Sequence, residues 1–239
     1  MAEQDGWRNR LSDGITIVLS ILAAFALDSW WDNYTITRNV ENGIRAVAEE
    51  LVDVVAHLDQ RLAAYDQAIG YLSEALELIE STEPNQVVQV PDKLMAGALY
   101  TPTIDPPTGA LVTFIDSGLL TGVVNKELRQ QIGELPSRID DGADDELSAL
   151  GYVDENVRPT LERSLSSADF SAVLRQMPHY WASFRSDVPW AEPSVPVSVF
   201  ASRELHNTIA SRLQMMEFAR VEVRDLQQSA ATTLAMTGY

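Results

Sequence analysis

Residues 14–31 constrain this chain more than any other segment, because their sequence, GITIVLSILAAFALDSWW, suits a lipid bilayer better than water. A helix over these residues rises about 27 Å at about 1.5 Å per residue, close to the roughly 30 Å hydrocarbon core of a bilayer. The sequence therefore predicts one transmembrane helix over 14–31, preceded by a short tail, 1–13, and followed by a body, 32–239.

The residues that flank this run predict its orientation. Arg8 and Arg10 precede it, whereas Asp28 lies near its end and Asp32 follows it directly. Because positive residues are retained on the cytoplasmic side, we expect the tail in the cytoplasm and the body in the periplasm, with the helix in a bacterial inner membrane. Tryptophans bracket the run, as expected of rings that settle at the two lipid–water interfaces. These interface anchors are Trp7, Trp30 and Trp31.

A cleaved secretory signal is the alternative interpretation of the same run. Ala24-Phe25-Ala26 has the small-x-small pattern of a cleavage site after an apolar core. Asp5 and Asp13 dilute the basic end that a signal needs, so the uncleaved anchor is preferred. Under either interpretation residues 32–239 are exported.

The composition of the chain indicates which compartment suits the body and which partners its charge disfavours. The chain has no cysteine, so packing alone must hold the fold in an oxidising compartment such as the periplasm. Its net charge is −18, and such a surface repels phosphate backbones. Nucleic acid is therefore excluded as an expected partner.

After the membrane run, apolar side chains recur at intervals of three or four, which predicts one long helix with a single buried seam. Gly43 and Gly70 lie within this pattern without interrupting it, and residues 33–37 are a potential bend between the two parts. The seam could serve an internal bundle or a coiled-coil dimer of two copies. It consists of Val40, Ile44, Val47, Leu51, Val54, Leu58, Leu62, Tyr65, Ile69, Leu72, Leu76 and Ile79.

The rest of the body reads as shorter helices divided by prolines and turns. The expected elements are an extended connector over 86–91, helices over 93–99, 107–116, 126–135 and 139–165, and a last helix over 202–235. The last helix is expected to pack antiparallel to the first, with Leu205, Ile209, Leu213, Met216, Val223, Leu226 and Leu234 inward. The predicted fold is all-α, with the membrane helix continuing into a long helix of an extramembrane helical bundle.

Residues 178–197 differ in kind, because prolines and aromatic residues are both concentrated there. Prolines fix an irregular backbone and aromatic rings need burial, so we expect a structured loop wrapped on the bundle. The alternative is a surface that contacts a partner protein, since exposed aromatic side chains often anchor interfaces. The candidate contact residues are Tyr180, Trp181, Phe184 and Trp190.

The residues that carry chemistry give no catalytic pattern. His57, His179 and His206 are the only imidazoles, and none lies three or four residues from another. No nucleophile elbow or phosphate-binding glycine loop occurs. The acidic cluster 140–146 lacks the order of an EF-hand and is expected to be a solvated turn that caps the next helix. We therefore expect no enzyme activity, no metal site and no cofactor.

One face of the membrane run is a candidate docking surface. Small residues let helix backbones approach closely where lipid offers no hydrophobic reward for association. The candidate docking face consists of Thr16, Ser20, Ala23, Ala24 and Asp28. The alternative is that small residues simply occur in membrane spans.

The order of these features resembles an uncharacterised family of bacterial single-pass membrane proteins. The resemblance covers residues 10–135 and is carried by the Trp-terminated run 14–31 and by Thr113-Phe-Ile-Asp-Ser-Gly-Leu-Leu-Thr-Gly-Val-Val-Asn-Lys-Glu-Leu-Arg129. It implies one amino-terminal membrane helix and a helical exported domain, with no function attached. The physics of the motif indicates a corner in which Ser117-Gly118 ends one helix and Asn125 begins the next.

These observations predict a structural or accessory subunit whose span docks on a larger membrane protein complex, and whose exported bundle braces that complex. An energy-converting assembly, photosynthetic or respiratory, is one example of such a complex. The alternative is an exported helical module that senses or binds a ligand and acts through a partner.

Overall fold

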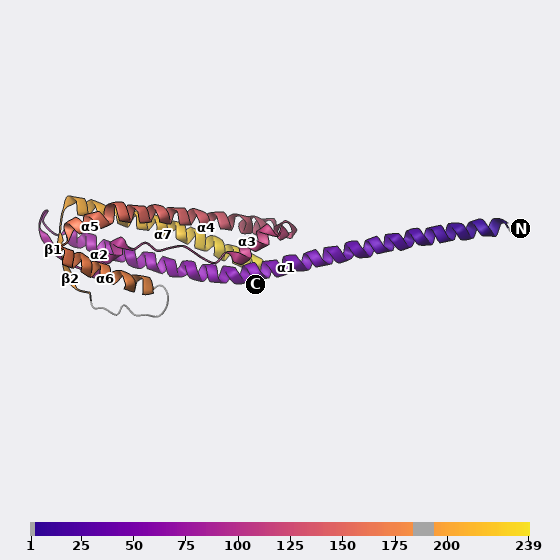
Figure 1. The fold of residues 1–239 in the computed structure, drawn as a ribbon, viewed down its shortest axis with the longest axis horizontal. Helices are drawn as coiled ribbons and strands as arrows, with labels where there is room; N and C mark the ends of the chain where they lie inside the picture. Colours follow the sequence, from indigo (N-terminus) through magenta and orange to yellow (C-terminus); the bar gives the residue numbers. More distant parts are fainter. Residues whose placement is uncertain (1–2, 184–193) are drawn as a thin grey trace.

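The computed structural model describes residues 3–183 and 194–239, with side chains described for 18–142, 147–177 and 194–239. Three long helices dominate, namely α1 (Glu3–Glu80), α4 (Lys126–Tyr152) and α7 (Arg203–Thr237). The carboxyl-terminal part of α1 and the whole of α4 and α7 form a bundle. The amino-terminal part of α1 projects from one end of this bundle as a rod (Figure 1). The predicted helical class is therefore confirmed.

The long helix α1 has two environments along its length. From Val40 to Ile79 every residue of the predicted seam is buried or half-buried, whereas residues 18–39 are exposed. Residues 33–37, the potential bend, stay helical, and the Thr37 hydroxyl donates to the Asn33 carbonyl at 2.9 Å there. The rod and the first wall of the bundle are thus one element.

Helix α7 packs antiparallel to α1, as the sequence predicts, and four pairs mark the register. His206 contacts Glu80, Arg220 contacts Asp66 and Gln227 contacts Asp59, while the Arg45 guanidinium lies 5.5 Å from the Tyr239 ring centre. From the first pair to the second, α7 advances fourteen residues and α1 retreats fourteen; from the second to the third, both move seven. These are heptad steps, so the seam belongs to an intramolecular coiled coil.

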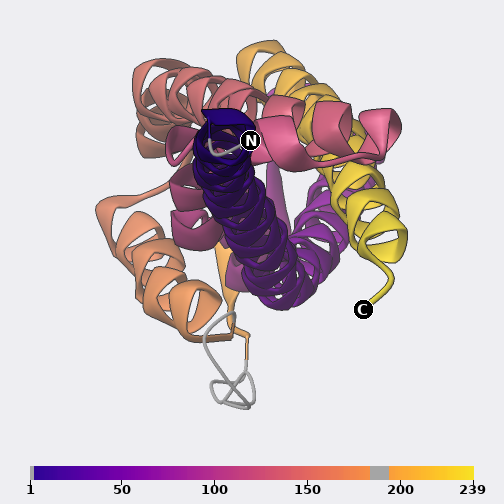
Figure 2. The same cartoon turned by 90° about the vertical axis from the view of Figure 1, so that its right-hand side faces the viewer.

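Shorter elements surround this pair. They are α2 (Asp92–Leu99), α3 (Gly109–Asp116), a 3₁₀ turn η1 (Leu119–Gly122), a π-helical turn η2 (Val153–Val157), α5 (Arg158–Ser164) and α6 (Ser167–Ser183). Viewed from the end where α1 projects, α1, α4 and α7 surround a common centre and α6 lies at the edge (Figure 2). At the opposite end β1 (Val87–Pro91) pairs antiparallel with β2 (Pro196–Phe200), with Val88 opposite Val199.

Three expectations need correction. The connector 86–91 is extended as expected, but residues Val87–Pro91 are strand β1, because a second strand pairs with them from more than a hundred residues away. The segment 178–197 is not irregular throughout, since residues 178–183 belong to α6 and residues 196–197 begin β2. Residues 184–193 lie outside the described residues. The acidic cluster 140–146 is not a turn but part of α4, which continues through Pro136 and through Gly142.

The corner predicted from the sequence is confirmed. Gly118 has φ +76°, a left-handed conformation that glycine adopts without strain, and it follows the end of α3. The Asn125 side chain accepts from the backbone N–H groups of Glu127 and Leu128 and so begins α4. The corner is attached to α1 by Glu50, whose two carboxylate oxygens accept from the backbone of Ala110 and Leu111 at 2.8 Å.

The linker between α2 and α3 runs extended along the bundle, and much of it is buried. Tyr100, Thr101, Pro102, Ile104 and Pro106 are all buried. The N–H groups of a buried non-helical backbone need hydrogen-bond partners, because a buried N–H group without one is costly. Prolines have no N–H, so their use here reduces the number of donors that need a partner.

Among the residues that the structure describes, no helix is both long enough and apolar enough to cross a membrane. The predicted span begins at Gly14, and the side chains of residues 14–17 lie outside the described ones.

The contact between α1 and α3 makes Gly43 a sensitive position. A Cβ atom there would lie 2.4 Å from the buried Phe114 ring, whereas a Cβ at Gly70 would meet nothing within 4 Å. We expect Gly43→Ala to destabilise the fold by about 1–3 kcal/mol through overpacking. We expect Gly70→Ala, the matched control, to stabilise it by up to about 1 kcal/mol through helix propensity.

Thermal unfolding of the full chain in detergent, followed by circular dichroism, measures both effects. The double variant Gly43→Ala/Phe114→Leu should recover part of the loss. Equal melting temperatures for Gly43→Ala and Gly70→Ala would contradict the close contact between α1 and α3.

Candidate functional site

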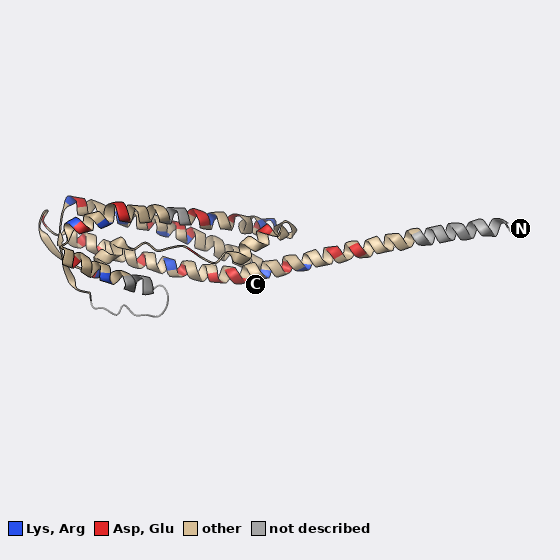
Figure 3. Cartoon of the chain, in the orientation of Figure 1, with Lys and Arg blue, Asp and Glu red and all other residues tan. Residues whose placement is uncertain are grey.

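The projecting part of α1 is a long apolar surface. Ten large apolar side chains between Val18 and Ile36 are each 41–66% exposed. Residues 18–27 carry no charged side chain, and Figure 3 shows an uncharged stretch of the rod before its first acidic band. Soluble proteins rarely expose so much contiguous apolar surface unless it binds lipid or another protein.

An aromatic group follows this stretch. Trp30 stacks on Tyr34 with ring centres 5.8 Å apart, and Trp31 lies 6.1 Å from Tyr34. The Arg38 guanidinium lies 5.1 Å from the Tyr34 ring centre, within the range of a cation–π contact. Two of the three predicted interface anchors therefore form one group with a cation on its bundle side.

The candidate docking face is exposed wherever its side chains are described. Ser20, Ala23, Ala24 and Asp28 are exposed on the rod. The side chain of Thr16 lies outside the described ones. The same holds for the interface anchor Trp7 and for the candidate partner contacts Tyr180, Trp181, Phe184 and Trp190.

A cleft of about 270 Å³ opens between α4 and α7. Tyr65 of α1 and Ile104 of the linker line it together with Val223 and Leu226 of α7. Its other lining residues are Arg138, Asp141, Gly142, Ala149, Ala219, Glu222 and Asp225. Sequence reasoning did not find this cleft, because its lining comes from four separate parts of the chain.

A buried arginine is a second feature that sequence reasoning missed. Arg212 is fully buried in α7, and its Nη2 donates to the Tyr100 carbonyl at 2.6 Å and to the Thr101 hydroxyl at 3.2 Å. Its Nε and Nη1 have no hydrogen-bond partner. Burial lowers the pKa of Arg212 to about 10, while nearby Tyr65 and Tyr152 act in the opposite direction.

Arg212 has a structural explanation in the linker. Tyr100 is the residue that ends α2, so its carbonyl lies at the negative end of the helix dipole. A cation there satisfies the carbonyl and favours the turn into the buried linker. The heptad steps 205, 209, 212 and 216 place Arg212 at an inward position, which was the signal available in the sequence.

Asp92 is the second buried polar centre. It is 2% exposed, and its carboxylate accepts from Lys93 N, Gln176 Nε2, Ser194 Oγ and Val195 N at 2.6–3.1 Å. Four donors compensate for burying one carboxylate. Asp92 thereby connects α2 with α6 and with the two residues that precede β2.

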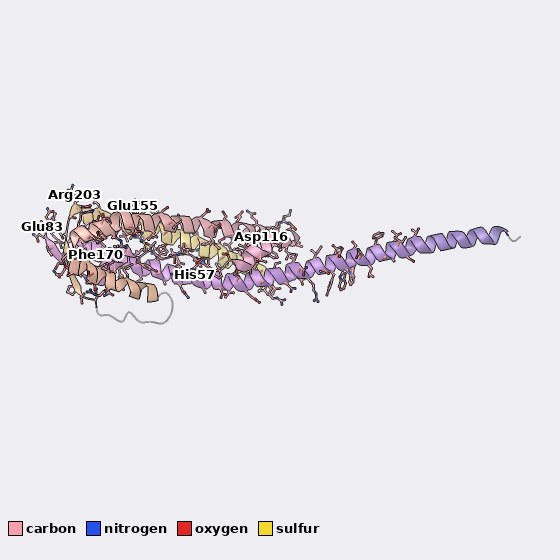
Figure 4. The ribbon with its side chains drawn as sticks, in the orientation of Figure 1. His57, Glu83, Asp116, Glu155, Phe170 and Arg203 are labelled. Carbon is pink, nitrogen blue, oxygen red and sulfur yellow. The ribbon has the colours of Figure 1, made fainter. Side chains whose placement is uncertain are left out.

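The histidines lie apart from one another. His57 lies on the part of α1 that belongs to the bundle, away from the tip that Glu83 and Arg203 mark (Figure 4), and its Nε2 accepts from Arg61 at 3.3 Å. His206 contacts Glu80 at 2.9 Å. The side chain of His179 lies outside the described ones. Within the described residues, no group of three or more histidines, aspartates and glutamates is arranged to hold a metal ion.

A comparison of this chain with protein-family models, with curated proteins and with solved structures finds no match.

The two described histidines should affect stability with opposite dependence on pH. The Glu80 carboxylate, then Asn207, raises the pKa of His206 above its usual 6.5, so its stabilisation is complete below about pH 6.5 and is lost as pH rises through the raised value. Burial and Arg61 lower the pKa of His57 although Asp105 opposes them, so its contribution is complete above about pH 6.5 and is lost as pH falls.

We therefore expect His206→Gln to be less stable than the parent chain at pH 5.5, by about 0.2–1 kcal/mol, and closer to it at pH 8. His57→Gln should show the reverse trend. Thermal unfolding of the two variants and the parent at both pH values measures this. Parallel trends for the two variants would contradict the assigned environments.

Proposed function

We propose that this chain is a non-catalytic accessory subunit, anchored by residues 14–31 of α1 in a bacterial inner membrane with its bundle in the periplasm. In this proposal the span docks on a larger membrane protein complex and the exported bundle braces that complex.

The observation that carries the proposal is the distribution of apolar side chains around the rod. At 100° per residue, Val18 and Phe25 point to one side, Leu27 and Tyr34 to the opposite side, and Leu19 and Ile21 to the two flanks. A helix that pairs with one soluble partner needs only an apolar stripe, whereas a helix that is apolar all round belongs in lipid or in a protein core. Burying each such side chain is favourable by about 1.5–3 kcal/mol, which supports a lipid environment.

The small residues of the candidate docking face support a helical partner within the bilayer. Apolar side chains gain nothing by leaving lipid for another apolar surface, so close backbone approach at small residues must supply the association. Ser20, Ala23 and Ala24 leave such a surface on one side of α1. The continuity of α1 supports the bracing role, because a bundle that continues its own anchor holds a fixed direction.

A ligand-binding module that acts through a partner is the second candidate function. The cleft between α4 and α7 favours it, because small-molecule sites commonly lie between helices of bundles. The two candidates are compatible in one chain.

The topology can be tested directly because the natural chain has no cysteine. We expect Ser137→Cys, on the exposed side of α4, to react with a membrane-impermeant maleimide in spheroplasts. Gln4→Cys, in the tail, should react only after lysis. The reverse pattern would overturn the orientation, and recovery of the chain in the soluble fraction would overturn the anchor.

The docking face can be tested by one change made on two sides of the rod. Ala24→Leu fills the small-residue face, so we expect it to weaken co-migration of the partner complex by about tenfold in native gels of gently solubilised membranes. Ala26→Leu makes the same change on the opposite side and should leave co-migration unaltered.

Membrane fractionation and the melting temperature of each variant provide the controls for insertion and folding. Equal co-migration of the Ala24→Leu and Ala26→Leu variants would reject the docking face. A parent chain that migrates only as a monomer or as a dimer of itself would reject the accessory role.

A further inference from the structure

The cleft between α4 and α7 exists because three small residues face one another across it. Gly142 and Ala149 lie on α4, and Ala219 lies on α7. Elsewhere the same helices present Leu135, Ile139 and Met216 to the core, and these are buried. These larger side chains set the distance between the two helix backbones. Where the facing side chains are small, a gap therefore remains between the helices.

The inner part of the cleft is apolar and ends on an aromatic ring. Val223 and Leu226 form one side, and both are buried. Tyr65 and Ile104 form the base, with exposed fractions of 3% and 6%. The volume of about 270 Å³ is near the lower limit of small-molecule sites, so it suits a small apolar body and not an extended chain.

The rim of the cleft has a charge imbalance. Asp141, Glu222 and Asp225 contribute three carboxylates, and Arg138 contributes the one cation. The Arg138 guanidinium already donates to Glu134 and to the Ser229 hydroxyl, both at 3.0 Å. The potential at the mouth is therefore negative, and the net charge of −18 over the whole chain acts in the same direction.

We propose that this cleft binds a small cationic amphiphile, an organic ammonium ion whose apolar body enters the cleft and whose cationic head remains among the rim carboxylates. The apolar base gives such a ligand its affinity through burial, and the rim selects the sign of its charge. Tyr65 at the base suits an aromatic or compact aliphatic body. The inference does not depend on membrane anchoring.

Three probes with one body and different heads test the proposal. They are 2-phenylethylamine, 2-phenylethanol and 3-phenylpropionate, offered to the full chain in phosphatidylcholine nanodiscs at pH 7. Saturation-transfer NMR titrations, with empty nanodiscs subtracted, measure their dissociation constants. We expect the ammonium probe to bind about fivefold more tightly than the alcohol, the size of effect that two exposed ion contacts give, and the carboxylate most weakly.

Two variants separate the contributions of charge and space. Asp141→Asn/Asp225→Asn should weaken the ammonium probe about fivefold and leave the alcohol unchanged, while Asp53→Asn on the exposed side of α1 should change neither. Ala219→Leu should abolish binding of all three probes by filling the cleft, and Ala56→Leu, an exposed position on α1, should not.

Several outcomes would overturn the proposal. Equal affinity for the ammonium and alcohol probes would show that the rim selects no charge. Binding that survives Ala219→Leu would place the ligand elsewhere. No binding of any probe at millimolar concentration would reject the cleft as a site. The Asp141→Asn/Asp225→Asn variant changes only exposed side chains, so it keeps the test decisive if Ala219→Leu fails to fold.

Discussion

The antiparallel pairing of α1 with α7 is the interaction on which the rest of the structure depends. Its contacts recur at heptad steps from Glu80 and His206 at the tip to Asp59 and Gln227, and a further contact joins Arg45 and Tyr239 near the point where the rod leaves the bundle. The other elements are placed against this pair: Glu50 holds the start of α3 on α1, and Arg212 of α7 holds the end of α2. A chain without disulfides needs such a pair, because packing alone must fix the relative position of its shorter segments.

Periodicity predicted what lies along single helices, and it failed where distant segments meet. The seam from Val40 to Ile79 and the cap at Asn125 depend on local spacing, so both could be predicted from the sequence. Strand β1 could not, because five residues gain a partner only through β2 more than a hundred residues later. The cluster 140–146 was wrongly assigned to a turn, since a run of acidic residues describes a solvated surface equally well on a helix.

The candidate sites divide in the same way. The apolar rod could be predicted because its signal is composition within one segment, and Trp30, Trp31 and Tyr34 lie within one helical turn of each other. The cleft could not, because Tyr65, Ile104, Gly142 and Ala219 come from four segments and are small or apolar residues with no pattern of their own. Arg212 is the intermediate case: its heptad position indicated burial, but an arginine is normally assigned to the surface.

The continuity of α1 connects the two halves of the proposed function. In the proposed arrangement the span ends at Trp31, and burial in the bundle begins nine residues later at Val40, about 13 Å along the helix axis. A flexible linker of that length would let the bundle change direction freely, whereas an unbroken helix fixes both its distance from the bilayer and its rotation about the axis. A partner that contacts the span at Ala24 would then meet one defined face of the bundle. A brace requires this property, and a simple tether does not.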